Sequence, residues 1–310
     1  MKQTVIGVDI GGTNLRIACV DRTGGIKSPL VCSSKILVDA DDSITKTAEV
    51  LAGYIKNNAV GDIEAVSIGF PGAISKDRQT TLSIPNLPNG DKGFDGRNVV
   101  VPLQQHLRVP VFINKDANNL LQCDIRLRNL YGKGITTGFY FGTGIGNSIF
   151  INDAFVFGKH GVATDIGHIP VFRSERICNC GNTGCVECYA SGFYLQEMWK
   201  NNFSHVPFSR IFTLCRHEQL IADFIDACAI TVATEVNILD PDLVIIGGGV
   251  VEMEGFPADL LQERIRFHCR KPYPAQGVVM TTPIVSKDAG VLGAAFYAYD
   301  LIDGIRVATV

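Results

Sequence analysis

Near its start the chain reads Thr4-Val-Ile-Gly-Val-Asp9-Ile-Gly11-Gly12-Thr13-Asn14-Leu-Arg16-Ile-Ala-Cys-Val20. Apolar residues up to Ile10 predict a buried strand, and Ile17 to Val20 predict a strand that returns antiparallel to it. The paired glycines between them allow a backbone to approach a phosphate group without a Cβ in the way. Asp9, at the end of the first strand, is a candidate ligand for a hydrated magnesium ion.

Two further glycine clusters follow apolar, strand-like segments. The first is Gly142-Thr143-Gly144-Ile145-Gly146-Asn147, and the chain returns in Ser148–Ile151. The second is Gly247-Gly248-Gly249, after a helix predicted over about 218–239 and a strand. Any one cluster can be a simple tight turn. Three of them at strand ends favour a nucleotide-binding site, to which two related domains contribute.

The composition is that of an ordinary globular protein. A chain of 310 residues with 46% apolar and 19% charged residues is long enough for two domains. Its net charge of −3 gives no reason to expect nucleic acid or an anionic membrane as a partner. The N-terminus turns polar too early for a secretion signal, and no apolar run is long enough to span a membrane. We therefore expect a cytoplasmic protein with reduced thiols.

One histidine and three cysteines gather in a polar, glycine-containing segment: His168, Cys178, Cys180 and Cys185. Four such ligands fit a tetrahedral zinc site, and a site with four protein ligands leaves no position for water, so the zinc would be structural. A chance cluster of buried cysteines is the simpler alternative, but this loop offers no other reason for them. Asp165 and Glu187 flank the ligands, so a bound metal would fix the positions of two carboxylates relative to each other.

A third acidic residue, Asp116, follows the apolar segment 109–113 through Asn114 and Lys115. We predict a helix from Asp116 to about residue 130. A carboxylate at the junction of a strand and a helix can face a ligand, and it can also cap the helix; the two roles are compatible. Segments 67–72 and 84–88 contain small residues that could line a cleft.

Together these motifs resemble the ROK sugar kinases. The segments 9–16 and 142–146 look like the family's two phosphate motifs, and 246–249 looks like its adenosine motif. Gly161-Val-Ala-Thr-Asp165-Ile-Gly167-His168 looks like the family signature, and Cys178-x-Cys180-Gly-x-x-Gly-Cys185-x-Glu187 looks like its zinc element. The resemblance covers nearly the whole chain.

The resemblance implies an actin-like, hexokinase-type α/β fold, related to ribonuclease H, with a nucleotide and sugar cleft between two domains. The N-terminal domain would comprise residues 1–117 and, through a C-terminal helix near 290–302, residues 291–310. The larger C-terminal domain would comprise 118–290 and would contain the zinc loop 168–187. Homodimers are usual in such a family.

The resemblance also implies an ATP-dependent sugar kinase that uses Mg²⁺ and a structural Zn²⁺. Asp116 would be the general base that takes the proton of the sugar's primary hydroxyl. The residues that would bind the nucleotide are Asp9, Gly11, Gly12, Thr13, Asn14, Arg16, Gly142, Thr143, Gly144, Gly146, Gly247, Gly248 and Gly249. The residues that would bind the sugar are Gly72, Asn86, Asn114, Lys115, Asp165, His168 and Glu187. His168 would also join Cys178, Cys180 and Cys185 as a zinc ligand.

Two positions depart from the usual family pattern. Lys115 stands where the family usually has Asn, and Asp165 stands where it usually has Glu. With segments 70–71, 75–77 and 85–88, Lys115 resembles the D-allose kinase branch, which implies phosphorylation of the 6-hydroxyl of D-allose to D-allose 6-phosphate. An exposed lysine at a helix start is the plain alternative for Lys115.

Other activities remain open. The same family includes kinases for glucose, fructose, mannose and N-acetylated hexosamines. It also includes sugar-sensing regulators, which would need a DNA-binding helix-turn-helix before the first strand, and that strand begins by Thr4. We therefore expect a small sugar as the partner, and neither nucleic acid nor a membrane.

Overall fold

The computed structural model describes residues 3–171 and 174–305. It divides into two compact units. Unit 1 comprises Met1–Tyr131, Asp153–Ala163 and Lys287–Val310, and unit 2 comprises Gly132–Asn152 and Thr164–Ser286. A boundary after residue 117 would cut the helix that begins at Asp116, whereas unit 1 keeps that helix whole. Each unit contains helices and a main sheet of its own.

The main sheet of unit 1 has the strand order β3-β2-β1-β4-β8. Its strands are β1 (Gln3–Ile10), β2 (Asn14–Val20), β3 (Ile26–Ser33), β4 (Asp62–Phe70) and β8 (Val111–Lys115). The predicted antiparallel return of β2 on β1 is confirmed. Strand β2 begins at Asn14, however, so the glycine turn between β1 and β2 is shorter than the predicted phosphate motif. Strands β1, β4 and β8 are parallel, so their carboxyl ends meet at one edge of the sheet.

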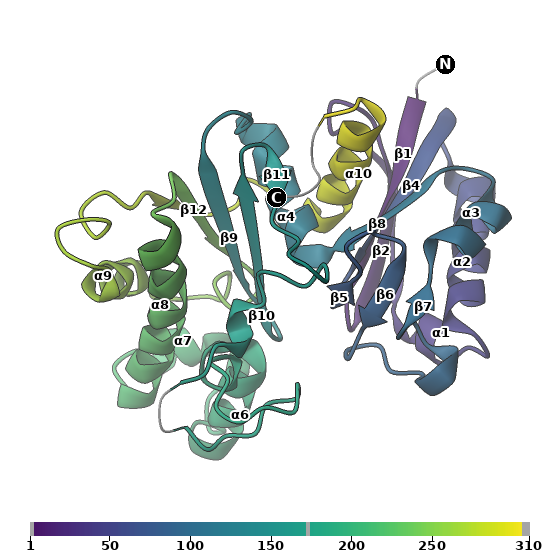
Figure 1. Ribbon diagram of the computed structural model, residues 1–310. Helices are drawn as coiled ribbons and strands as arrows, with labels where there is room; N and C mark the ends of the chain where they lie inside the picture. The colour runs from purple at the N-terminus through teal and green to yellow at the C-terminus, as the bar shows by residue number, and fades with distance from the viewer. Residues whose placement is uncertain (1–2, 172–173, 306–310) are drawn as a thin grey trace. The chain divides into compact units, whose positions relative to one another are not determined.

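The two faces of this sheet differ in chemistry. Buried apolar residues such as Ile6, Val8 and Ile68 point to one face and form a core with helices α2 (Ser43–Asn58) and α3 (Val100–Leu107). Figure 1 shows α2 and α3 on one side of the sheet, and α4 (Asp116–Arg128) and α10 (Ala289–Ile302) on the other. The face toward α4 and α10 has small and polar residues, because these helices approach it closely. A Cβ on Gly7, for example, would lie 2.2 Å from the carbonyl oxygen of Val291 in α10.

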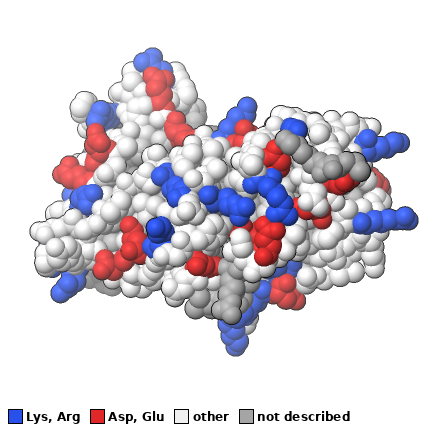
Figure 2. Space-filling model, turned by 90° about the horizontal axis from the view of Figure 1, so that it is seen from above, with Lys and Arg blue, Asp and Glu red and all other residues white. Residues whose placement is uncertain are grey.

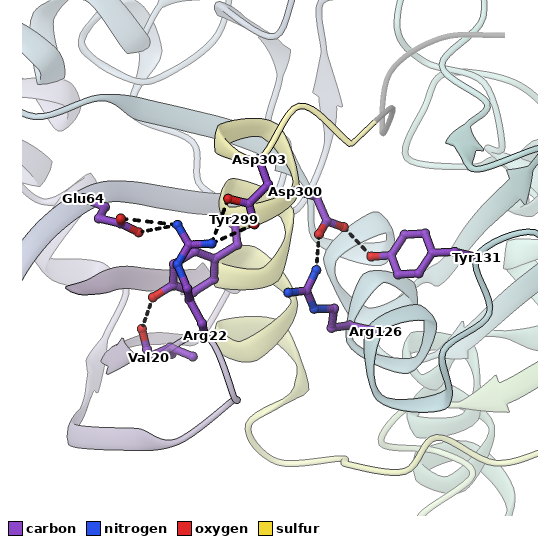
Figure 3. Close-up of polar contacts among 8 residues, drawn as sticks. All are labelled: Val20, Arg22, Glu64, Arg126, Tyr131, Tyr299, Asp300 and Asp303. Carbon is purple, nitrogen blue, oxygen red and sulfur yellow. Dashed lines mark hydrogen bonds and ion pairs between the residues drawn. The ribbon is translucent and has the colours of Figure 1, made fainter. Parts of the chain in front are cut away.

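Helix α10 (Ala289–Ile302), predicted over about 290–302, packs along α4 (Asp116–Arg128). A Cβ on Gly293 would stand 1.6 Å from the carbonyl oxygen of Asn119, so only glycine permits this approach. Near its end, α10 carries the buried Asp300, whose carboxylate accepts hydrogen bonds from Arg126 and Tyr131 (Figure 3). On another side of α10, Arg22 pairs with Asp303 at 2.7 Å.

The remaining elements of unit 1 are short. They are α1 (Lys35–Val38), η1 (Gly90–Lys92), β5 (Ala73–Ile74), β6 (Thr80–Ser83), β7 (Arg97–Asn98) and β11 (Ala154–Phe155). Strands β5, β6 and β7 form a small antiparallel sheet.

In unit 2 the strands follow the order β10-β9-β12-β13. They are β9 (Ile135–Phe141), β10 (Ile145–Ile151), β12 (Leu243–Gly247) and β13 (Met280–Thr281). The predicted return after the second glycine turn is confirmed, but β10 starts at Ile145 rather than Ser148. Strand β12 is parallel to β9, so both glycine clusters lie at the same sheet edge.

The helices of unit 2 are η2 (Ile166–His168), α5 (Glu187–Ala190), α6 (Gly192–Asn202), η3 (Phe208–Arg210), α7 (Ile211–Leu214), α8 (Gln219–Leu239) and α9 (Ala258–His268). Helix α8 confirms the predicted helix over about 218–239. Its buried face, including Phe224 and Val232, packs with Phe139 and Phe212 in an apolar core.

The surface carries mixed charge. Figure 2 shows basic and acidic side chains interspersed over the visible face. Among residues 3–171 and 174–305, no helix combines the length and the apolar character needed to cross a membrane.

Candidate functional site

The carboxyl edge of the parallel strands in unit 1 gathers two of the predicted acidic residues. The register pairs Asp9 of β1 with Gly69 of β4, and Gly69 with Asn114 of β8. Asp116 follows directly after β8, and a Cβ on Gly69 would lie 3.6 Å from its Cα. The tight neighbour is the Asn119 side chain, whose Nδ2 would lie 2.7 Å from that Cβ, so glycine at position 69 makes room for Asn119 beside Asp116. The carboxyl ends of parallel strands are where ligands bind in open α/β sheets.

Asp9 lies in a largely enclosed position beside a cation. Arg16 Nη1 lies 3.5 Å from Asp9 Oδ2. Burial raises the pKa of Asp9, and the nearby Arg16 opposes that rise. A Cβ on Gly290 of α10 would come within 2.6 Å of Asp9 Cγ, so the helix leaves room for this carboxylate only because it has glycine there. A single carboxylate of this kind fits a magnesium ion that keeps most of its water.

Asp116 is the first residue of α4, and Lys115 occupies the cap position. The alternative role of Asp116 as the helix cap is therefore not observed, and its Oδ1 accepts a hydrogen bond from the adjacent Ala117 N at 2.7 Å. Asn114 is fully buried, and its Oδ1 accepts from Asn118 Nδ2 at 3.0 Å. Asn114 thus fastens the end of β8 to the first turn of α4, next to Asp116.

The first glycine turn is held by a residue that the sequence did not single out. Ser34 Oγ donates to the carbonyl oxygen of Gly11 at 2.6 Å, and Ser34 N donates to that of Thr13 at 3.0 Å. Within the turn, Gly11 N donates to the carbonyl oxygen of Asn14 at 2.9 Å. The available signal was only a pair of serines after a strand. Sequence reasoning had no means of pairing them with a turn twenty residues earlier.

Two of the predicted sugar-binding residues also lie in unit 1. The exposed Asn86 lies next to the first glycine turn, because a Cβ on Gly12 would be 3.3 Å from Asn86 Cβ. Gly72 lies against Ser83, whose carbonyl oxygen would be 2.3 Å from a Cβ at position 72. Both residues belong to the segments that we predicted to line a cleft.

The second glycine turn in unit 2 is supported by the start of α6. Gly192 N donates to the carbonyl oxygen of Gly142 at 2.8 Å, and Phe193 N donates to that of Thr143 at 3.0 Å. A Cβ on Gly192 would lie 2.5 Å from the carbonyl oxygen of Gly142, so the approach requires glycine. Gly146, the last glycine of the motif, lies within β10.

The third glycine cluster, which follows β12, lies against Phe141 at the end of β9, next to the second glycine turn. Gly248 has a φ of +96°, and a Cβ there would come within 2.6 Å of the backbone of Phe141. Val250 N donates to the carbonyl oxygen of Phe141 at 2.9 Å. Gly247 ends β12, and the exposed Gly249 has open space where a side chain would be. The structure therefore brings the second and third clusters together at one edge.

The four predicted metal ligands converge. One ligand atom from each of His168, Cys178, Cys180 and Cys185 lies within 4.8 Å of all the others. Cys180 Sγ and Cys185 Sγ are 3.6 Å apart, and Cys178 Sγ is 3.7 Å from His168 Nδ1. Sulfur atoms bound at the usual distance to one tetrahedral zinc are about 3.8 Å apart. The set therefore fits a closed four-ligand site, although residues 172–173 of this loop lie outside the described part.

Asp165 and Glu187 lie at the two ends of the segment that supplies these ligands. Asp165 is exposed and precedes η2, whose last residue is His168. Glu187 is the first residue of α5, and its Oε2 accepts a hydrogen bond from Ile145 N at 2.8 Å. A Cβ on Gly167 would lie 3.2 Å from the same Oε2, so Glu187 lies between η2 and the second glycine turn.

The sequence profile of the ROK family matches residues 5–300. The chain belongs to the ROK family. The membership predicted from the glycine turns, the signature and the cysteine loop is thereby confirmed.

Among ROK proteins, the glucokinase of Thermotoga maritima is 26% identical, over 98% of this chain and 99% of its own. The N-acetyl-D-glucosamine kinase of Pectobacterium carotovorum is 26% identical, over 79% of this chain and 83% of its own. The crystal structure of a ROK family glucokinase from Streptomyces griseus in complex with glucose and AMPPNP has a TM-score of 0.78 at 25% identity, covering 94% of this chain and 98% of that one. The predicted hexokinase-type α/β fold is confirmed by this similarity.

Proposed function

We propose that this ROK protein transfers the γ-phosphoryl group of ATP to the 6-hydroxyl of a hexose. The observation that carries the proposal is the position of Asp116. It lies at the carboxyl edge of three parallel strands, at the first turn of α4, and on the same edge as Asp9. The relatives of this chain include a glucokinase and an N-acetyl-D-glucosamine kinase, which supports a sugar as the acceptor of the phosphoryl group.

In this proposal Asp116 accepts the proton of the sugar hydroxyl as that oxygen attacks the γ-phosphorus. The first and second glycine turns would donate backbone N–H groups to the phosphate oxygens, and glycine allows the close approach this needs. The Gly247–Gly249 cluster would lie along the adenosine. A magnesium ion bound with the nucleotide would offset charge on the phosphoryl oxygens, and Asp9 would hold it through water.

The metal loop, residues 168–187, would have a structural role. A zinc ion on His168, Cys178, Cys180 and Cys185 would have four protein ligands, so it would stabilise the fold of the loop and leave the chemistry to other residues. The sugar-contact roles of Asp165 and Glu187 belong to the same proposal, because these two carboxylates flank the metal ligands in the sequence.

For the sugar itself we propose D-allose. The support is Lys115 immediately before the proposed base and Asp165, one methylene shorter than the usual glutamate. Allose differs from glucose in the orientation of one ring hydroxyl, so changes at two positions expected to contact the sugar are a reasonable way to prefer it. Glucose and N-acetyl-D-glucosamine are the competing substrates, because relatives that act on them match this chain.

A steady-state assay tests both the kinase activity and the choice of sugar. The purified protein would be supplied with ATP and Mg²⁺ and with D-allose, D-glucose, D-mannose, D-fructose or N-acetyl-D-glucosamine in turn, and ADP release would be measured. We expect the largest kcat/KM for allose. A larger value for glucose would remove the allose assignment and leave the kinase in place, whereas no turnover with any sugar would overturn the kinase assignment.

A further inference from the structure

We propose that Glu187 is a positioning residue that joins the metal loop to the second glycine turn. The turn's role in phosphate binding rests on the proposed function, but the join itself does not. Through Glu187, the conformation of the turn would depend on an intact metal loop. The sequence had suggested only a sugar contact for this residue.

The first support is a direct contact. Glu187 Oε2 accepts a hydrogen bond from Ile145 N at 2.8 Å, at the point where the turn becomes β10. A carboxylate that accepts from a backbone N–H makes a charge-assisted bond, which is stronger than a bond between neutral groups. The contact therefore fixes the last peptide of the turn.

The second support is steric. A Cβ on Gly144 would lie 2.6 Å from Glu187 Oε2, and the three nearest atoms to that position all belong to Glu187. Glycine at position 144 therefore makes room for this particular carboxylate. Because Gly144 has no side chain, the turn can contact Glu187 and can also approach a phosphate group.

The third support is that Glu187 stands directly after the metal ligands, at the end of the loop. Glu187 comes two residues after Cys185, which is buried among the ligand atoms. Val186 N donates to the carbonyl oxygen of Ile169 at 3.0 Å, which fastens the end of the loop to its beginning. Thr164, four residues before the loop, donates from its Oγ1 to the carbonyl oxygen of Asn147 in β10 at 2.9 Å, so it holds the strand rather than the turn. A change in the loop would therefore reach the turn through Glu187.

The role is compatible with the proposed sugar contact. A carboxylate has two oxygens, and the bond to Ile145 uses Oε2. The two roles are separable by measuring nucleotide binding without sugar, because a residue that only binds sugar would not affect it.

The test compares Glu187→Ala with Glu187→Gln. Glutamine keeps a carbonyl oxygen that can accept from Ile145 N, whereas alanine keeps none. Hydrogen exchange measured by mass spectrometry reports on the peptide that covers Gly142–Asn147, and calorimetry without sugar gives the Kd for Mg²⁺ and AMPPNP. We expect Glu187→Ala to speed exchange in this peptide and to weaken AMPPNP binding by up to about tenfold, because the freed turn would have to be ordered when the nucleotide binds. Glu187→Gln should stay within about threefold of the wild type, since a neutral acceptor remains.

Gly144→Ala supplies a second, independent variant. Its Cβ would displace the carboxylate, so it should speed exchange in the same peptide to a similar extent. The double variant Gly144→Ala, Glu187→Ala should be no worse than either single variant, because the contact is already lost. Additive effects would instead mean that the two residues act separately.

Removing the metal with a chelator completes the experiment. Chelation should speed exchange in this peptide in the wild type and add little in Glu187→Ala. Unchanged exchange in Glu187→Ala, or an equal effect of chelation in both proteins, would overturn the proposal. If the wild type failed to bind AMPPNP, the proposed function would fail, and the exchange measurements would still decide whether Glu187 holds the turn.

Discussion

The buried carboxylate of Asp300 in α10 accepts a hydrogen bond from Arg126 Nη1 of α4, the helix that begins at Asp116 (Figure 3). Gln122 Nε2 donates to the same carboxylate at 2.7 Å, and the Tyr131 hydroxyl is bonded to it as well. Burial raises the pKa of Asp300, and these partners oppose that rise. The C-terminal helix is thus tied by one carboxylate to the helix that starts with the proposed base.

We expect Asp300→Ala to destabilise the protein by about 2–4 kcal/mol, because it leaves buried donors without an acceptor. Asp303→Ala, at the C-cap of the same helix, is the matched control. Its pair with Arg22 has side chains 36% and 37% exposed, so we expect a loss below about 1 kcal/mol. Denaturant unfolding of the two variants measures the difference, and equal losses would contradict a special role for Asp300.

We expect Asp116→Asn to lower kcat by about 10²–10⁴-fold, because asparagine cannot accept the proton of the sugar hydroxyl. Sugar binding should change little, since the amide has nearly the same shape. Turnover measurements and calorimetry with the preferred sugar separate the two effects. Asp223→Asn, on the exposed face of α8, is the control. A near-normal rate in Asp116→Asn would remove this residue as the base.

We expect Cys180→Ser to lose bound zinc, because a serine hydroxyl is a poor ligand for zinc, and to lower thermal stability. Metal analysis of the purified protein and a thermal melt are the measurements. Cys32→Ser is the control, since Cys32 lies in β3 of unit 1 and is not one of the four converging ligands. A folded and fully active Cys180→Ser protein without metal would sink the structural-zinc assignment.

We expect the free energy of unfolding to fall as the pH rises from about 4.5 to about 7, because of Glu235. Burial raises the pKa of Glu235 from 4.5 to about 7, although Asn147 Nδ2 donates to its Oε1 at 3.2 Å. In the unfolded chain the carboxyl ionises near pH 4.5, whereas in the folded protein it stays protonated up to about pH 7. The folded state therefore binds more protons in this window, so its stability falls as the pH rises, by up to roughly 3 kcal/mol.

Glu235→Gln should abolish this dependence, since glutamine is neutral at every pH and keeps an acceptor for Asn147. Denaturant unfolding at pH 5 and pH 8 measures it, with the exposed Glu252→Gln as control. A wild-type stability that is equally high at both values, or that falls just as much in Glu235→Gln, would exclude Glu235 as the cause.

Local patterns in the sequence predicted the local elements well. Apolar segments next to glycine turns placed β1, β2 and β9, and α8 begins and ends within a residue or two of its predicted range. The C-terminal helix, expected near 290–302 from the family resemblance, is α10. Predictions erred where a boundary depends on pairing. Strand β10 starts at Ile145 because its residues pair with β9 as far as Phe141, and the α4 cap falls at Lys115.

The sequence by itself therefore determined the family, the strand–turn–strand units and the set of metal ligands, because each is specified by residues close together in the chain. Only the tertiary structure decided which segments meet: Asp9 pairs with Gly69 and Gly69 with Asn114, Ser34 contacts the first glycine turn, and Glu187 contacts the second. Such contacts join residues far apart in sequence. Their register is set by the packing of whole strands and helices, which leaves no signature in the local pattern.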